Sequence, residues 1–145
     1  MKRIQPRENY LGPGGWVWAG KYKLERYLYI LHRVTGVGLL LFFLIHLVET
    51  TVFRIQGQDV WEATMTLLQQ PWFEVGLYLV VVAFVFHAFN GLRLVFQELG
   101  FALGRPVPPI YPYKDAIRKK RFGTIAMLAV IGILSLIFFF DLFII

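Results

Sequence analysis

Residues 27–53 read YLYILHRVTGVGLLLFFLIHLVETTVF, an apolar run with few ionisable side chains. A helix needs about 20 residues, at about 1.5 Å each, to cross the roughly 30 Å hydrocarbon layer of a membrane. Two further runs meet this requirement, Trp72–Phe96 and Phe122–Ile145. The sequence therefore predicts an all-α membrane protein with three transmembrane helices.

The composition supports a membrane protein and limits its chemistry. Of the 145 residues, 57% are hydrophobic and 17% aromatic, and none is cysteine. Without cysteine the chain forms no disulfide and supplies no thiolate to zinc or to an iron–sulfur cluster. Any metal must therefore rest on histidine or carboxylate side chains. The residues before Tyr27 contain no apolar core of a signal peptide, so we expect no cleavable signal.

The basic residues predict the topology. Fourteen of the 15 Lys and Arg residues lie in residues 1–33 or 93–121, and the positive-inside rule places both segments in the cytoplasm. The expected organisation is a cytoplasmic arm with an interfacial amphipathic stretch (1–26), a first span (27–53), an outer loop (54–71), a second span (72–99), a cytoplasmic basic loop (100–121) and a third span (122–145). Within the outer loop, we expect a turn at 56–59 and a short helix at 60–69. The net charge of +6 then reflects topology and contact with anionic lipids, and we expect no nucleic-acid partner.

Two histidines share one face of the first predicted helix. At 100° per residue His32, Gly36 and His46 fall on the same stripe. Fourteen residues separate His32 from His46, or ~21 Å along the axis, so the two cannot bind one metal. Each can serve a separate site, and Gly36 leaves the face open for a flat ligand.

The second predicted helix carries a further polar stripe. His87, Asn90 and Gly91 lie on one face, with Arg93 nearer the cytoplasmic end. A neutral imidazole is a common axial ligand of haem b, and a neighbouring glycine allows close approach to the backbone. Arg93 and Arg33 can pair with haem propionates. Interhelical hydrogen bonding and a transporter's proton relay are alternative uses of these histidines.

A third group of polar residues lies near the cytoplasmic end of the first helix. Tyr29, His32 and Arg33 can form a polar pocket for a quinone, whose carbonyls need hydrogen-bond donors and whose tail needs lipid. Snorkelling to lipid headgroups is the alternative for Arg33. Lone polar side chains in three helices also need partners, which implies a bundle with a second membrane subunit.

Two segments carry a family resemblance. Tyr29–Gly36 (YILHRVTG) and Phe86–Arg93 (FHAFNGLR) resemble the two signatures of the cytochrome b556 anchor subunit of succinate dehydrogenase (succinate:quinone oxidoreductase, complex II). The resemblance implies a prokaryotic inner-membrane complex that links the tricarboxylic acid cycle to electron transport. In it a flavoprotein oxidises succinate, an iron–sulfur subunit passes electrons on, and two anchor subunits reduce quinone. His87 would be an axial ligand of haem iron, with the other ligand on the partner anchor, and His32 and Arg33 would lie near the propionates and the quinone. Succinate chemistry would lie in another subunit.

Two positions differ among the members of this family. Many family members have serine where Tyr29 stands, so a tyrosine hydroxyl would have to replace the serine at the quinone. His46 resembles a histidine of members with two haems. With both helices antiparallel, a rise of ~1.5 Å per residue puts His87 ~18 Å and His46 ~28 Å from the cytoplasmic end, which suits a second haem iron at His46. A haem-free transporter or structural subunit, and a dihaem subunit of another dehydrogenase, are the alternatives.

Overall fold

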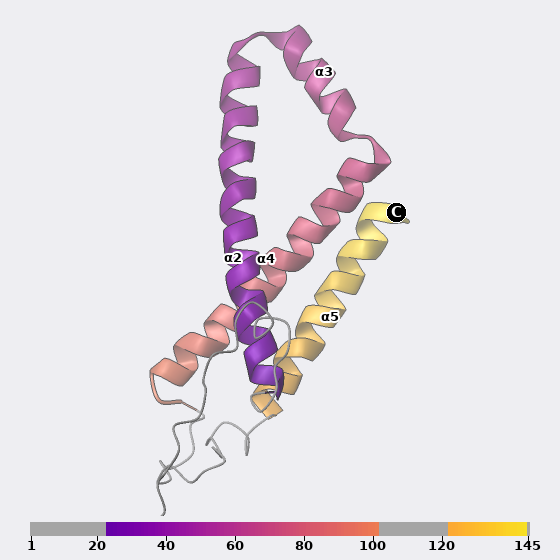
Figure 1. Ribbon diagram of the computed structural model, residues 1–145. Helices are drawn as coiled ribbons and strands as arrows, with labels where there is room; N and C mark the ends of the chain where they lie inside the picture. Colours follow the sequence, from indigo (N-terminus) through magenta and orange to yellow (C-terminus); the bar gives the residue numbers. More distant parts are fainter. Residues whose placement is uncertain (1–22, 102–121, 145) are drawn as a thin grey trace, which may run out of the picture.

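The computed structural model describes residues 23–101 and 122–144, and all of its regular elements are helices (Figure 1). Three of these helices are long and apolar enough to cross a membrane, over Leu24–Phe53, Pro71–Glu98 and Phe122–Phe143. The predicted all-α class and the three candidate spans are therefore confirmed. In chain order the elements are α2 (Lys23–Val48), the π-helical turn η2 (Glu49–Phe53), α3 (Gln58–Leu68), α4 (Pro71–Glu98) and α5 (Phe122–Phe143).

The first long helix begins earlier than the apolar pattern indicates. Hydropathy places its start at Tyr27, whereas α2 begins at Lys23. Lys, Leu, Glu and Arg are all good helix formers, so the helix continues through polar residues that a hydropathy profile assigns to the surface. Glu25 lies in the first turn, where a carboxylate interacts favourably with the helix dipole. The extension matters because it brings Glu25 into the helix bundle.

The connection between the first two spans is almost entirely helical. The sequence suggests a turn at 56–59, but α3 already begins at Gln58, so the non-helical part is shorter than expected. Gly57 makes the reversal with φ +118°, a conformation that glycine adopts without steric cost. Pro71 then opens α4, as predicted from the tolerance of helix N-termini for proline.

The long helices meet near one end and separate toward the other. Helix α4 contacts both α2 and α5. It runs obliquely behind α2, and α3 bridges the gap where the two helices have moved apart (Figure 1). The small buried core lies where the three helices meet and contains Leu28, Val85, Phe86, Met127 and Ile131.

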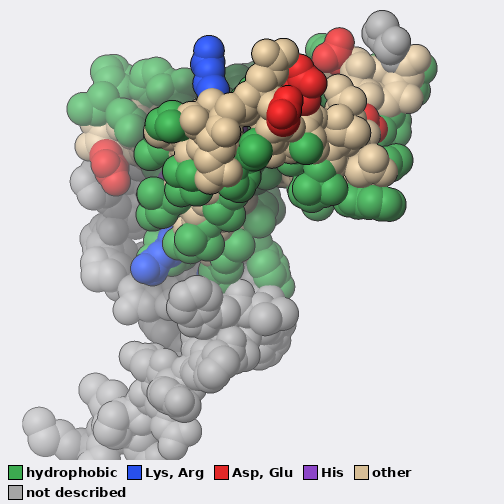
Figure 2. Space-filling model, turned by 90° about the horizontal axis from the view of Figure 1, so that it is seen from above, with side chains coloured by type: hydrophobic (Ala, Val, Ile, Leu, Met, Phe, Trp, Pro, Cys, Tyr) green, Lys and Arg blue, Asp and Glu red, His purple; other side chains and the backbone are tan. Residues whose placement is uncertain are grey.

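Most large apolar side chains lie outside this core. Exposed examples run along α2 and η2 from Leu40 to Val52 and along α5 from Ile133 to Phe140. Viewed from the α3 end, apolar side chains cover much of the described surface, with only scattered charges (Figure 2). Such a surface suits hydrocarbon or further membrane helices. The bundle with a partner anchor subunit stays a prediction.

Candidate functional site

The crossing of α2 and α4 brings two of the predicted site residues into direct contact. The imidazole rings of His32 and His87 stack with their centroids 4.0 Å apart and their planes 7° from parallel. The contact arises because α4 crosses α2 obliquely, so the C-terminal turns of α4 extend past the crossing (Figure 1). The predicted depths of His87 and His46 in the membrane stay predictions.

A glycine on each helix provides the space for the histidine ring of the other helix. A Cβ atom on Gly36 would lie 2.8 Å from Cε1 of His87, and one on Gly91 would lie 3.3 Å from Cε1 of His32. The sequence had suggested that Gly36 opens the helix to a flat ligand. In the structure the adjacent space is filled by the imidazole of His87. The two glycines thus make the close histidine pair sterically possible.

Hydrogen bonds fix the orientation of the His87 ring. Its Nδ1 lies 3.1 Å from the backbone carbonyl oxygen of His32 and 3.2 Å from Oγ1 of Thr35. The Thr35 hydroxyl lies 2.8 Å from the carbonyl oxygen of Leu31, to which it donates, so it can accept at the same time. With acceptors on both sides, Nδ1 carries the proton. Nε2 is then the nitrogen with a free lone pair.

This arrangement has the form of a metal-binding histidine. Ligating histidines commonly donate their other ring N–H to a backbone carbonyl, which holds the ring and raises its basicity. Thr35 is not among the site residues predicted from the sequence. Its position three residues after His32, one helical turn away, is the signal that would have identified it.

The stacked pair also limits how an iron could be bound. Two parallel rings in contact lie side by side, so they cannot ligate one haem iron from opposite faces of the macrocycle. Nor do the described residues contain a group of three or more His, Cys, Asp or Glu side chains that would hold a bare metal ion. Haem needs only axial ligands from protein, so His87 fits as a single ligand.

Several polar atoms around the crossing have no hydrogen-bond partner within the described ranges. Asn90 is 0% exposed, and both its side-chain oxygen and nitrogen are unsatisfied, as are Nδ1 of His32 and Nε of Arg93. Each such group typically costs about 1–3 kcal/mol. These donors and acceptors fit a site that receives a polar ligand or ordered water.

An ion pair ties the three long helices together beside this site. Arg93 of α4 donates to Oε2 of Glu25 on α2 at 2.9 Å and to Oγ1 of Thr124 on α5 at 3.0 Å. The Arg93 side chain is 10% exposed and that of Glu25 is 28% exposed. Arg93 was predicted to pair with a haem propionate. Here its charge is balanced by a carboxylate of the same chain, which the sequence had assigned to the surface arm.

The predicted quinone residues divide between two environments. Arg33 donates to the hydroxyl of Tyr29 at 2.9 Å, and its guanidinium lies 5.5 Å from the centre of the Tyr29 ring. Both side chains are exposed, whereas His32 is half-buried against α4. The Tyr29–Arg33 pair therefore faces away from the protein core, as a site open to lipid or to another subunit would require.

His46 lies apart from the histidine pair. Its ring stacks on Phe42 with centroids 5.7 Å apart, and its Nδ1 is 3.8 Å from Oε2 of Glu49. The side chain is 54% exposed, on the part of α2 that has separated from α4. A second haem ligand at His46 stays a prediction, and its other contacts would have to come from outside the described residues.

The two glycines of the first helix provide a matched pair of variants. For Gly36→Ala, we expect displacement of the His87 ring, because the new methyl would overlap Cε1, with a cost of about 1–3 kcal/mol in stability. Gly38→Ala should be neutral or slightly stabilising, since nothing lies within 4 Å of a Cβ there. Unfolding of the two variants in mixed micelles measures the difference. Equal effects would show that the close approach is absent.

Comparison with known proteins places the chain in a family. Residues 17–138 match the model of the succinate dehydrogenase/fumarate reductase transmembrane subunit. The chain is also 29% identical over 94 residues to the succinate dehydrogenase 2 membrane subunit SdhC of Mycobacterium tuberculosis. That alignment covers 64% of this chain and 60% of the mycobacterial protein. The family match covers α2 and α4, which form the histidine crossing, and most of α5, and the chain therefore belongs to the succinate dehydrogenase/fumarate reductase transmembrane subunits.

Proposed function

We propose that this chain is a cytochrome b anchor subunit that carries electrons from an iron–sulfur subunit to a quinone. It works beside a second anchor subunit, and succinate is oxidised on a separate flavoprotein subunit. The complex lies in the inner membrane of a prokaryotic cell, with the N-terminus and the basic loop in the cytoplasm. The distribution of Lys and Arg supports this orientation.

The observation that carries the proposal is the orientation of His87. Its Nδ1 is held by the His32 carbonyl and Thr35, so Nε2 is the atom available to haem iron. Haem supplies one-electron redox chemistry when it is bound. His32 stacks on His87, so any further ligand to the iron would come from the partner anchor. The unsatisfied atoms of Asn90 and Arg93 are suited to polar groups at the haem edge.

Tyr29, His32 and Arg33 serve the quinone in this proposal. Arg33 and the Tyr29 hydroxyl donate hydrogen bonds to a carbonyl oxygen, and the positive charge of Arg33 stabilises negative charge that develops on reduction. The half-buried His32 is placed to deliver a proton. Exposure of the Tyr29–Arg33 pair supports this role, because the quinone must enter from lipid.

A comparison of two electron acceptors tests this function. The purified complex should reduce both a soluble dye and a quinone with electrons from succinate. Arg33→Leu should lower quinone reduction at least tenfold, because the loss of a charged donor costs about 1.5–3 kcal/mol, while dye reduction remains. Arg33→Lys should recover part of the activity. Equal loss of both activities would place the defect outside the quinone site.

Thr35 gives a separate test of the haem ligand. Thr35→Val keeps the shape but removes the acceptor at His87 Nδ1, so the imidazole becomes a weaker donor to iron. We expect haem affinity to fall about 10-fold and the midpoint potential to rise. Thr35→Ser retains the hydroxyl and should behave like the wild type. Redox titration of both variants compares them, and an unchanged potential in Thr35→Val would remove Thr35 from this role.

A further inference from the structure

A cleft lies at the opposite end of the first span from the histidine pair. It occupies about 520 Å³ between the end of η2 and the start of α3, and its lining residues are Arg54, Gly57, Gln58, Trp61 and Glu62. The apolar span before it covers 30 residues, or ~45 Å of helix, which matches a bilayer with its headgroups. The cleft therefore lies at the headgroup level of the membrane face opposite to Lys23.

The cleft contains an isolated cation. Arg54 is the only Lys or Arg in the sequence from Val34 to Leu92. Among the described residues no carboxylate pairs with it, because the ion pairs there join His46 to Glu49 and Arg93 to Glu25. An unpaired guanidinium at headgroup depth is suited to bind phosphate.

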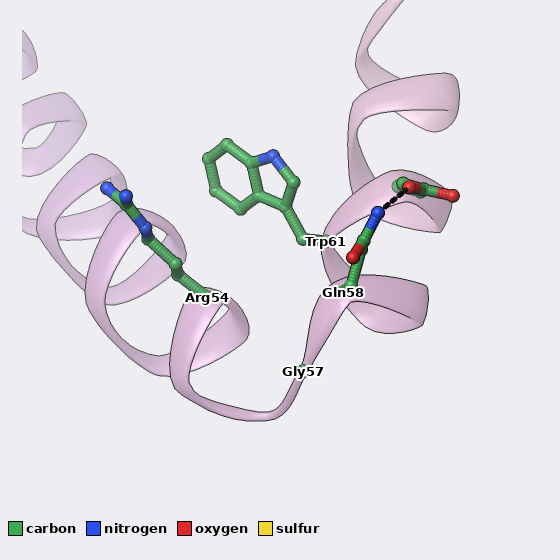
Figure 3. A pocket seen from close by; sticks show the side chains of 5 residues that line it. Arg54, Gly57, Gln58 and Trp61 are labelled. Carbon is green, nitrogen blue, oxygen red and sulfur yellow. Dashed lines mark hydrogen bonds between the residues drawn. The ribbon is translucent and has the colours of Figure 1, made fainter.

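Two features of α3 complete the phosphate-binding side of the cleft. Gly57 precedes the helix and provides no side-chain cap, so N–H groups of the first turn point outward without such a partner. Half-buried Trp61 projects from α3 toward the helix that carries Arg54 (Figure 3). Tryptophan is enriched at membrane interfaces because its ring is apolar and its indole N–H can donate a hydrogen bond.

A carboxylate lines the same cleft without neutralising Arg54. Glu62 accepts a hydrogen bond from Nε2 of Gln58 at 2.7 Å, the dashed line in Figure 3, and both side chains line the cleft. The formal charges of the lining, one positive and one negative, sum to zero. A headgroup with both a phosphate and an amine complements this pair, whereas a purely anionic headgroup would bring its negative charge toward Glu62.

We propose that this cleft binds the headgroup of an amine-bearing phospholipid such as phosphatidylethanolamine. Arg54, the first turn of α3 and the Trp61 indole hold the phosphate, and Glu62 holds the ammonium group. The bound lipid stabilises the turn that joins the first two spans. This proposal concerns a different face from the haem and quinone residues and does not depend on them.

Lipid retention by the purified membrane complex tests the site. Complexes are placed in nanodiscs of equal parts phosphatidylethanolamine and phosphatidylglycerol, and tightly bound lipids are counted by native mass spectrometry. Arg54→Gln should raise the dissociation constant for phosphatidylethanolamine about tenfold, and Arg54→Lys should raise it less. Glu62→Gln should retain a lipid but lose the preference for the amine headgroup.

Asp59→Asn is the matched control, because Asp59 is a carboxylate of the first turn of α3 that does not line the cleft. It should retain phosphatidylethanolamine like the wild type. The proposal is overturned if Arg54→Gln retains this lipid equally well, or if the wild type retains phosphatidylglycerol as readily. Binding of radiolabelled orthophosphate to the delipidated complex, lost in Arg54→Gln, would assign the cleft to free phosphate and also overturn it.

Discussion

Complexes that carry His87→Ala should contain no haem at this position, because the proposed iron ligand is gone. We expect the pyridine haemochrome assay to show one haem fewer per complex than in the wild type. Electron transfer from succinate to a soluble dye should remain, since the proposed function assigns those reactions to other subunits. The change removes a ring that packs against Gly36 and His32, so retention of all subunits on size-exclusion chromatography must accompany the measurement.

His46→Ala separates ligation at His87 from general effects of histidine removal. Its side chain is exposed and contacts Phe42 and Glu49 of the same stretch of helix, so its loss should not disturb the α2–α4 crossing. If His46 holds a second haem, this variant loses that haem and keeps the one at His87. Full haem content in His87→Ala would contradict the proposed ligand.

The second large effect is expected at the Glu25–Arg93 ion pair. Removal of one partner leaves a charge in a poorly hydrated environment, which costs about 3–5 kcal/mol for a fully buried pair. Because Glu25 is 28% exposed, we expect Glu25→Ala to lower the free energy of unfolding by about 1–3 kcal/mol. Equilibrium unfolding of the complex in mixed micelles measures this change.

Two further variants test whether the loss of stability in Glu25→Ala comes from the ion pair. Glu98→Ala removes an exposed carboxylate near the same end of α4 and should change stability by less than about 0.5 kcal/mol. Glu25→Ala combined with Arg93→Ala should cost less than the sum of the single changes, because neither charge is then left unpaired. Additive effects would show that the pair contributes no coupling.

The spans could be predicted from sequence because their signal is local. Crossing a hydrocarbon layer requires a minimum length of apolar helix, and residues 27–53, 72–96 and 122–145 satisfy it without reference to tertiary structure. The start of α2 could not be read in this way. Lys23–Arg26 is polar yet favours helix, so hydropathy and helix propensity disagree there, and helix propensity decides the local structure.

The site was predicted only in part because it depends on how the helices cross. Periodicity placed His32 with Gly36, and His87 with Gly91, on their helix faces. Sequence periodicity gives no information on the crossing angle of α2 and α4. This angle determines that each imidazole ring lies against the glycine of the other helix. The contact between Glu25 and Arg93 could not be predicted for the same reason, because it joins residues 68 positions apart on two different helices.

The close packing at the crossing gives the polar residues a specific arrangement. His87 is held by a backbone carbonyl and a threonine on α2, so α2 positions the proposed iron ligand that α4 carries. Arg93 connects the same region to α5 through Thr124. The third helix, which contributes no histidine, therefore takes part in fixing the site.

The most direct test asks whether His87 itself binds iron. The complex is purified with His87→Gly, which leaves a ring-sized space beside Gly36, and its dithionite-reduced minus oxidised spectrum is recorded with and without added imidazole. If His87 binds the iron, the low-spin cytochrome b spectrum is absent in the variant and returns with imidazole. An unchanged low-spin spectrum in His87→Gly without imidazole would show that another residue binds the iron and would contradict the proposed role of His87.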